Sequence, residues 1–191
     1  MSEIERCAIE NDLAMHTAPT LLGVKCANLI SVKQSEKTIS EYLTESGISG
    51  SSGTLRARVL CRCRERILVY VYQEHMLSAW LSTGQVRDFL EEYGYRSDMD
   101  IDTMLDILAS RMKCGDFPHE IGAFLGYPIG DIRGFIDNQG KNCLMCGYWK
   151  VYENAASAQK TFQMYDRCRK ILCDRLKKGL NLFQAISKEE I

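Results

Sequence analysis

Hydrophobic residues near the C-terminus recur every three or four positions, which is the spacing of an amphipathic helix. The members of this stripe are Ala158, Phe162, Tyr165, Cys168, Leu172 and Leu176. Gly179 follows the stripe and suits a left-handed helix exit. Because steps of three and four place side chains on one face, the pattern predicts the longest helix of the chain here.

Two further helices are predicted from their start signals. Residues 38–41 read Thr-Ile-Ser-Glu, which has the form of a capping box, and Gly47 would end the short helix that follows. Residues 97–100 form a looser box, after which apolar residues at helical spacing continue until Gly115. The members of this second stripe are Ile101, Met104, Leu105, Leu108 and Met112.

β-Branched and aromatic residues concentrate in four segments, residues 28–33, 55–63, 67–72 and 145–152, and these are the predicted strands. The short gap at residues 64–66 predicts a β-hairpin. Several helices are expected between residues 72 and 145, so strands and helices do not alternate regularly. The pattern predicts one α+β domain over residues 1–191, with a small, mainly antiparallel sheet of about four strands packed with helices.

The middle of the chain has the spacing of a helix-turn-helix, with Pro128 starting the second helix. The residues that carry this spacing are Gly122, Leu125, Gly126, Tyr127, Ile132, Phe135 and Ile136. The second helix is expected to expose Asp131 and Asp137, whose carboxylates would repel a nucleic-acid backbone. A packed helical hairpin is therefore favoured over nucleic-acid binding.

Composition adds limits on the class of protein. The chain has 191 residues, 46% of them hydrophobic and 26% charged, as expected for a folded protein. The formal net charge of −1 provides no overall field that would attract nucleic acid or anionic lipid. The acidic N-terminus lacks the apolar core of a signal peptide, and no apolar stretch approaches the length of a membrane span. Nine cysteines without an export signal predict reduced thiols in the cytoplasm.

Two segments carry a family resemblance: residues 16–29 (HTAPTLLGVKCANL) and residues 117–152 (FPHEIGAFLGYPIGDIRGFIDNQGKNCLMCGYWKVY). Through them the chain resembles an uncharacterised bacterial family, domain of unknown function 3793, which occurs mostly in anaerobic Firmicutes. The resemblance covers most of the chain and implies a cytosolic bacterial protein. The family has no assigned reaction, so the resemblance transfers no catalytic residues to this sequence.

Histidine is scarce in this chain, and two of the three histidines fall in the segments just quoted. Histidine titrates near neutral pH and can act as an acid or a base, while lysine can bind an anion. The leading hypothesis is a polar cleft between the two segments that binds a small anionic molecule, either as a binding protein or as an enzyme. Its candidate catalytic residues are His16, Lys25, His119, Glu120 and Lys150.

A second hypothesis concerns thiol chemistry. Cys143 and Cys146 have the two-residue gap of a metal-binding knuckle, and Cys61 and Cys63 could add two ligands for zinc or an iron-sulfur cluster. The Cys143–Cys146 pair could equally be a redox pair. A regular strand through residues 143–146 would turn the two thiols to opposite faces, so buried, unreactive thiols are the simpler interpretation.

Five arginines alternate with other residues and would share one face of a continuous strand. They are Arg56, Arg58, Arg62, Arg64 and Arg66. Such a patch could bind a phosphate, an acidic partner or RNA, so nucleic-acid binding, through the helix-turn-helix-like hairpin or this strand, is a third hypothesis. Solvated charges that protect a sheet edge explain the pattern as well, and the β-hairpin turn expected near Arg64 would break the shared face. The sequence does not identify a cofactor or an oligomeric state.

Overall fold

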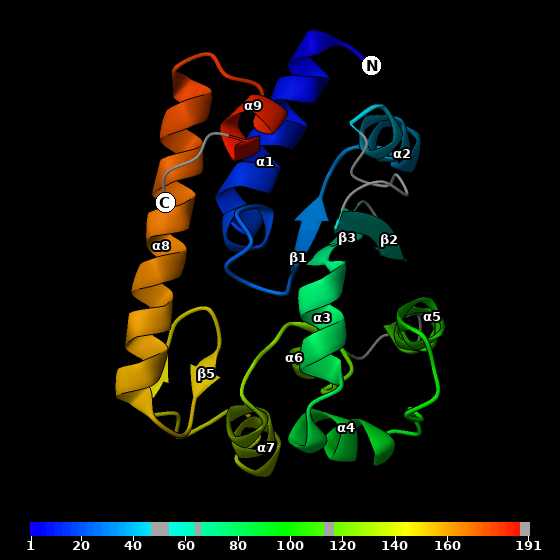
Figure 1. Cartoon of the computed structure of the whole chain (residues 1–191), viewed down its shortest axis with the longest axis vertical. Coiled ribbons are helices and arrows are strands. Elements are labelled where there is room, and N and C mark those ends of the chain that lie inside the picture. Colours follow the sequence, from blue (N-terminus) through cyan, green and yellow to red (C-terminus); the bar gives the residue numbers. More distant parts are fainter. Residues whose placement is uncertain (47–53, 64–65, 113–116, 188–191) are drawn as a thin grey trace. The chain divides into compact units, whose positions relative to one another are not determined.

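The computed structural model describes residues 1–46, 54–63, 66–112 and 117–187 (Figure 1). The chain divides into two compact units. Unit 1 comprises Met1–His75 and Tyr165–Ile191, and unit 2 comprises Met76–Met164. Strands and helices follow one another without regular βαβ alternation, so the predicted α+β class is confirmed.

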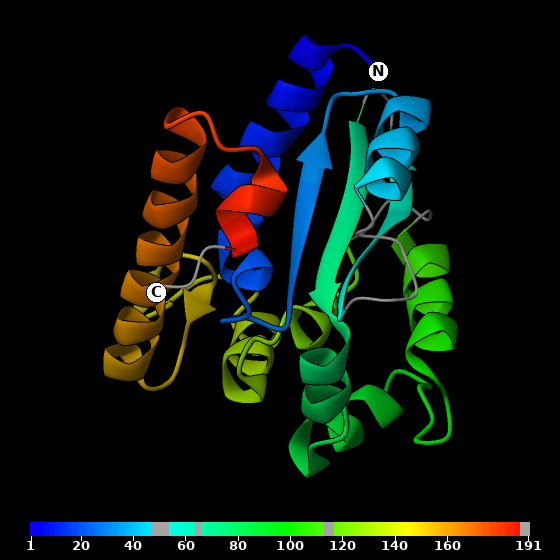
Figure 2. The same ribbon diagram turned by 45° about the horizontal axis from the view of Figure 1, so that its top comes forward.

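Unit 1 contains a three-stranded antiparallel sheet formed by β1 (Ala27–Val32), β2 (Leu55–Cys63) and β3 (Arg66–Gln73). The strand order is β1-β3-β2, so β3 lies in the centre (Figure 2). β2 and β3, which stand before and after the short gap in the sequence, pair antiparallel, so the hairpin prediction is confirmed. The three N-terminal strand predictions are confirmed to within one or two residues.

Helices cover one face of this sheet. They are α1 (Glu3–Leu21), α2 (Glu36–Glu45), the C-terminal part of α8 (Ala155–Lys177) and α9 (Leu182–Ser187). Alternate residues of the sheet, such as Ile30 and Val69, are buried in one cluster with Leu13 of α1 and Leu172 of α8. This period-two burial explains why the strand pattern was legible in the sequence. α8 is the long C-terminal helix that the stripe predicted.

The start of α2 differs from the prediction. Ser35, not Thr38, is the N-cap residue, and its hydroxyl accepts a hydrogen bond from the Thr38 amide at 3.1 Å. The predicted capping box over residues 38–41 is therefore wrong, because an equally suitable serine stands one turn earlier. The predicted stop at Gly47 lies outside the described residues.

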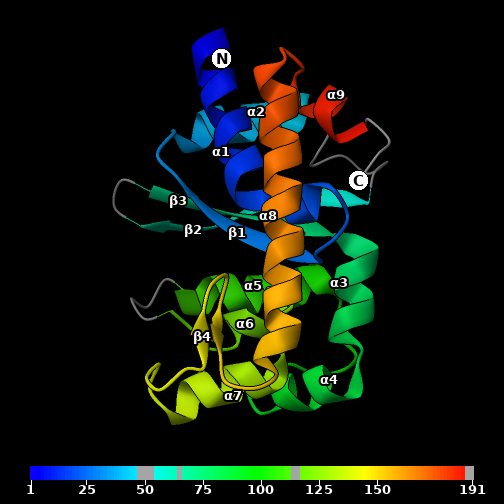
Figure 3. The same ribbon diagram turned by 90° about the vertical axis from the view of Figure 1, so that its left-hand side faces the viewer.

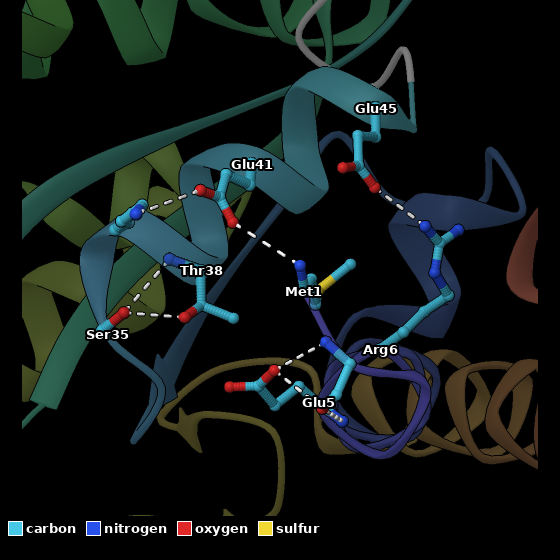
Figure 4. A network of polar contacts seen from close by, with 9 residues as sticks. Met1, Glu5, Arg6, Ser35, Thr38, Glu41 and Glu45 are labelled. Atoms are coloured by element: carbon cyan, nitrogen blue, oxygen red, sulfur yellow. Dashed lines mark hydrogen bonds and ion pairs between the residues drawn. The ribbon is translucent and has the colours of Figure 1, made fainter.

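The N-terminal end of α1 is tied to α2 by surface charges (Figure 4). Arg6 pairs with Glu45 at 2.8 Å, and the terminal amine of Met1 lies 3.9 Å from a Glu41 carboxylate oxygen. Ser2 begins α1 with a complete capping box to Glu5. The sequence analysis did not predict α1, although this box is a start signal that it could have used.

A β-bulge changes the side-chain pattern of β2 at its middle. The register shifts between Val59 and Cys61, so Leu60 has no partner on β3. One extra residue in a strand reverses the face on which the following side chains lie. Of the five arginines predicted to share a face, Arg64 lies outside the described residues.

The remaining arginines do not form one continuous face. Arg58 lies opposite Tyr70, whereas Arg62 lies opposite Ile67, whose side chain belongs to the core that the helices cover. Arg62 accordingly forms an ion pair with Glu36 of α2. A face shared by all the arginines required one continuous strand, and the expected hairpin already places Arg66 on β3. The bulge, which the alternation of the sequence does not show, divides the remaining arginines of β2 further.

Unit 2 is mainly helical (Figure 3). Its helices include most of α3 (Glu74–Leu81), α4 (Gly84–Glu91), α5 (Ile101–Met112), α6 (Ile121–Phe124) and α7 (Ile129–Asp137). α5 confirms the second predicted stripe. The Asp100 carboxylate accepts a hydrogen bond from the Thr103 amide at 2.8 Å at the start of this helix. The predicted stop at Gly115 lies outside the described residues. α6 and α7 form the predicted helical hairpin.

The predicted fourth strand is a short hairpin, β4 (Met145–Cys146) paired antiparallel with β5 (Lys150–Val151). The chain turns within the predicted strand because the Gly147 amide donates to the Trp149 carbonyl at 3.1 Å. Val151 is fully buried with Ala158 and Phe162 of the N-terminal part of α8. Across the described ranges of the chain, no helix is long and apolar enough to cross a membrane.

Candidate functional site: an aromatic cavity in unit 2

The segment that contains the β4–β5 hairpin is anchored to α7 by one carboxylate. Asp131, in the first turn of α7, is 4% exposed. Its Oδ1 accepts the backbone amides of Tyr152 at 2.7 Å and Glu153 at 2.9 Å, and its Oδ2 accepts the indole N–H of Trp149 at 2.7 Å. Three hydrogen bonds from residues 149–153 therefore fix this segment against the helix.

A glycine allows the close approach of helix and hairpin. A Cβ atom on Gly134 would lie 2.5 Å from Cβ and Cγ of Tyr152, which is closer than carbon atoms can pack. The side chain of Tyr152, from its Cβ outwards, therefore occupies the space that any larger residue at position 134 would need. Gly134 is thus a packing requirement within a helix, where glycine otherwise weakens the structure.

The two hairpins of unit 2 enclose a cavity of about 420 Å³. Its lining comes from residues 117–122, from α7 and its preceding turn, and from residues 149–150. Four of the lining side chains are aromatic: Phe117, Tyr127, Phe135 and Trp149. Small-molecule sites in proteins have this size and this apolar character.

The aromatic walls are organised in two parts. Tyr127 and Trp149 are stacked, with ring centroids 5.2 Å apart and planes inclined by 29°. The Tyr127 hydroxyl donates to the Tyr148 carbonyl at 3.2 Å, and burial raises the pKa of this phenol to about 12. Phe117 and Phe135, in contrast, remain 56% and 36% exposed. The cavity therefore has a fixed inner wall and an open aromatic rim.

Two predicted site residues, His119 and Lys150, line this cavity together. The imidazole of His119 meets Phe135 edge-on at 5.8 Å, and Lys150 Nζ lies 5.7 Å from the centroid of the same ring. The ammonium also donates to the Gly140 carbonyl at 2.6 Å. One phenyl ring thus positions both nitrogen-bearing groups at the edge of an apolar cavity.

Glu120 does not line the cavity with its neighbour His119. It is 2% exposed, and its Oε1 accepts a hydrogen bond from Arg111 of α5 at 2.5 Å. The same guanidinium donates to the Tyr93 carbonyl, and Glu120 contributes to raising the pKa of Arg111. Glu120 therefore holds α5 to the α6 segment, which is a structural position for a residue expected to be catalytic.

The other two predicted residues, His16 and Lys25, belong to unit 1. His16 is exposed on α1. Lys25 is 4% exposed, and its Nζ donates to the Ala27 carbonyl at 2.7 Å and lies 5.9 Å from the ring centroid of Tyr165. Burial lowers the pKa of Lys25 to about 8. A common cleft would join residues of both units and stays a prediction.

The cysteines proposed as metal ligands occur in different units. Cys61 is buried in β2, while Cys143 is half-buried and Cys146 exposed near β4; the side chain of Cys63 lies outside the description. Burial alternates along residues 143–146, the pattern of an extended segment with successive side chains on opposite faces. Among the described residues, no cluster of three or more potential ligands is present. The thiol-metal hypothesis stays a prediction.

The expectation that Asp131 is exposed is wrong, because this residue is only 4% exposed. Helical spacing contained the missing signal, because Asp131 lies one turn before Phe135, on the face that α7 presents to the cavity. Phe117 and Tyr127 were likewise not selected as candidate ligand contacts. Arg133 of α7, in contrast, is exposed and forms an ion pair with Glu92 of unit 2.

Comparisons with known proteins give a family but no activity. A family model described as a protein of unknown function, DUF3793, matches residues 13–186. The resemblance seen in the sequence is thereby confirmed over nearly the whole chain. No curated protein and no solved structure matches the chain.

Proposed function

We propose that the chain, which belongs to the DUF3793 family, binds a small organic anion with a flat apolar body in the aromatic cavity of unit 2. One observation carries the proposal: a cavity of about 420 Å³ that combines aromatic walls with a lysine and a histidine. A cavity of this size and apolar character, open to solvent at its rim, is typical of a ligand site.

The aromatic walls suit a planar ligand. Offset stacking and edge contacts between rings each contribute about 0.5–1.5 kcal/mol beyond the burial of apolar area. The exposed faces of Phe117 and Phe135 would be covered by the ligand, which removes apolar surface from water.

The polar groups of the cavity suit an anion. The ammonium of Lys150 retains N–H donors beyond the one that it gives to Gly140, and a charge-assisted hydrogen bond to a carboxylate or phosphate would use one of them. His119 lies against the same phenyl ring and can donate a second bond. If the ligand is a substrate, His119 is the acid–base group that a reaction in this cavity would use.

The proposal places the protein in the cytoplasm. The cysteines that the structure describes carry free thiols, which is the state of cysteine in a reducing compartment.

Indole-3-acetate, a flat aromatic carboxylate, is a suitable probe for isothermal titration calorimetry. We expect binding with a Kd below about 1 mM. Lys150→Met should weaken binding about tenfold or more because the anion loses its charged partner, while Lys150→Arg should retain most of the affinity.

Lys160→Met is the matched control, since Lys160 is exposed on α8 within unit 2 and is not a lining residue of the cavity. Absence of binding to the wild-type protein, or equal affinity of wild type and Lys150→Met, would contradict the proposal. A ¹H–¹⁵N correlation spectrum of each variant shows whether unit 2 keeps its fold.

A further inference from the structure

Among the described residues, the carboxylate of Asp131 has one hydrogen-bonding position that no donor fills. Each oxygen of a carboxylate has two lone pairs in the plane of the group. Oδ1 accepts two backbone amides, those of Tyr152 and Glu153, and is complete. Oδ2 accepts one hydrogen bond in the described part of the chain, from the Trp149 indole N–H.

Asp131 borders the cavity. Asp131 and Trp149 are both lining residues, and Asp131 is only 4% exposed. Within the described chain, Asp131 takes part in no ion pair, so its charge is compensated by the three N–H groups and by the N-terminal end of α7. A buried acceptor in an apolar cavity gains free energy from each further donor that reaches it.

From this we infer, on the basis of the function proposed above, that the ligand is a heteroaromatic anion whose ring carries an N–H donor. The ring N–H donates to Oδ2 of Asp131, the ring packs against the stacked pair Tyr127 and Trp149, and the anionic substituent lies at Lys150. Asp131 therefore selects between flat anions of the same shape.

A neutral ring donor fits this site better than an ammonium group does. The carboxylate already has three hydrogen bonds, so one further bond completes it without a second full charge. An ammonium group would have to lose most of its water in an apolar space, which costs several kcal/mol. A neutral ring N–H gives up a single hydrogen bond to water, which the bond to Oδ2 replaces, so its desolvation costs much less, and the aromatic walls stay in contact with a flat surface.

A matched pair of probes tests the inference on the intact wild-type protein. Indole-3-acetate and 1-benzothiophene-3-acetate have the same shape and the same carboxylate, but sulfur replaces the ring N–H in the second. We expect the indole to bind about tenfold more tightly by calorimetry, although the benzothiophene is the more apolar ring. In ¹⁵N-labelled indole-3-acetate, the bound ring N–H proton should shift downfield and exchange slowly with water.

The outcomes separate the inference from the proposed function. Equal affinities for the two probes, or a ring N–H that exchanges freely in the complex, would overturn the role of Asp131 and leave the cavity as an anion site. Failure of both probes to bind would reject the proposed function together with the inference. The comparison changes the probe and leaves Asp131 in place. The hydrogen bonds by which Asp131 anchors residues 149–153 therefore stay intact in both measurements.

Discussion

At the scale of single residues, Lys25 shows how burial changes a charged group. Its side chain is 4% exposed, and desolvation lowers its pKa to about 8. Adjacent Cys26 is also buried, and desolvation raises the pKa of its thiol. The methylene chain of Lys25 adds apolar contact to unit 1, but the ammonium is less stable there than in water.

The lowered pKa predicts a rise in stability with pH. Below pH 8, Lys25 is protonated in both the folded and the unfolded chain. Between pH 8 and about 10.5, the unfolded chain keeps the proton that the folded chain has lost, so the free energy of unfolding rises with pH. The contribution reaches about 3 kcal/mol at the upper end of this window.

Urea unfolding of wild type and Lys25→Met at several pH values measures this effect. The stability of the wild type relative to the variant should increase by up to about 3 kcal/mol between pH 7.5 and 10.5. The difference between the two free energies of unfolding cancels the contribution of the buried tyrosines, which titrate in both proteins. Lys33→Met, at an exposed position of unit 1, should show a constant difference. A pH-independent difference for Lys25→Met would mean that the ammonium is not desolvated.

The residue scale also shows what the sequence could reveal about the site. His119 stands out in the sequence because histidine is scarce, and Lys150 because it is a charged residue within an aromatic segment. Both residues line the same cavity. Glu120 was chosen by the same reasoning and pairs with Arg111, since residue type does not tell which face of a turn a side chain takes. For Asp131, the spacing of one turn from Phe135 indicates the face on which it lies, but two of its three hydrogen-bond partners are backbone amides, which leave no trace in the sequence.

At the scale of elements, helix starts depend on contacts between segments that are distant in the sequence. Glu10 of α1 is 7% exposed, and its carboxylate accepts the Leu182 amide at 3.2 Å and the Tyr42 hydroxyl at 3.5 Å. The first turn of α9 thus depends on a carboxylate from α1, in addition to the local bonds between Asn181 and Gln184.

Glu10→Ala should destabilise α9 more than it changes the rest of unit 1. It leaves the Leu182 amide and the Tyr42 hydroxyl buried without an acceptor, at a cost of about 1–3 kcal/mol for each group. Hydrogen exchange followed by mass spectrometry should show faster exchange in residues 182–187. Glu3→Ala, at an exposed position in the same helix, is the control. Unchanged protection of α9 in Glu10→Ala would show that its local caps suffice.

The elements also separate what periodicity can and cannot predict. Long stripes such as those of α5 and α8 were legible because one face of each helix is buried over several turns. The bulge at Leu60 could not be predicted in this way. An inserted residue leaves the alternation of arginines in the sequence intact, but it reverses the face of the sheet on which the arginines after the bulge lie. α1 was missed because threonines and Pro19 occupy its buried C-terminal turns.

At the scale of the whole molecule, two helices belong to both units. α3 begins in unit 1 and continues in unit 2, and α8 contributes its first part to unit 2 and the remainder to unit 1. Helix formation is cooperative, so the end of a helix is destabilised when its other end unfolds. That residues 1–191 form one domain stays a prediction, and it requires that the two units unfold together.

Equilibrium unfolding in urea tests that prediction. Both tryptophans, Trp80 and Trp149, lie in unit 2, whereas circular dichroism reports the helices and strands of both units. We expect the fluorescence and dichroism transitions to have the same midpoint and slope. A dichroism change that continues after the fluorescence transition is complete would instead establish two domains.

The fold class was predictable because it depends only on the order and type of the elements, and three strands and two long helical stripes had clear periods. The cavity was not predictable as a whole. It arises where the α6–α7 turn meets the β4–β5 hairpin, and neither the turn inside residues 145–152 nor the hydrogen bonds of Asp131 have a periodic signature.

The contact between Gly134 and Tyr152 links the histories of two positions in the family. A lineage that gained a side chain at position 134 would place its Cβ 2.5 Å from Cβ and Cγ of residue 152, so either the two backbones must move apart or position 152 must first become glycine. In an alignment of related sequences, glycine at the first position should accompany a residue other than glycine at the second. Where both have changed together, the geometry of the neighbouring cavity, and the choice of ligand with it, should have diverged.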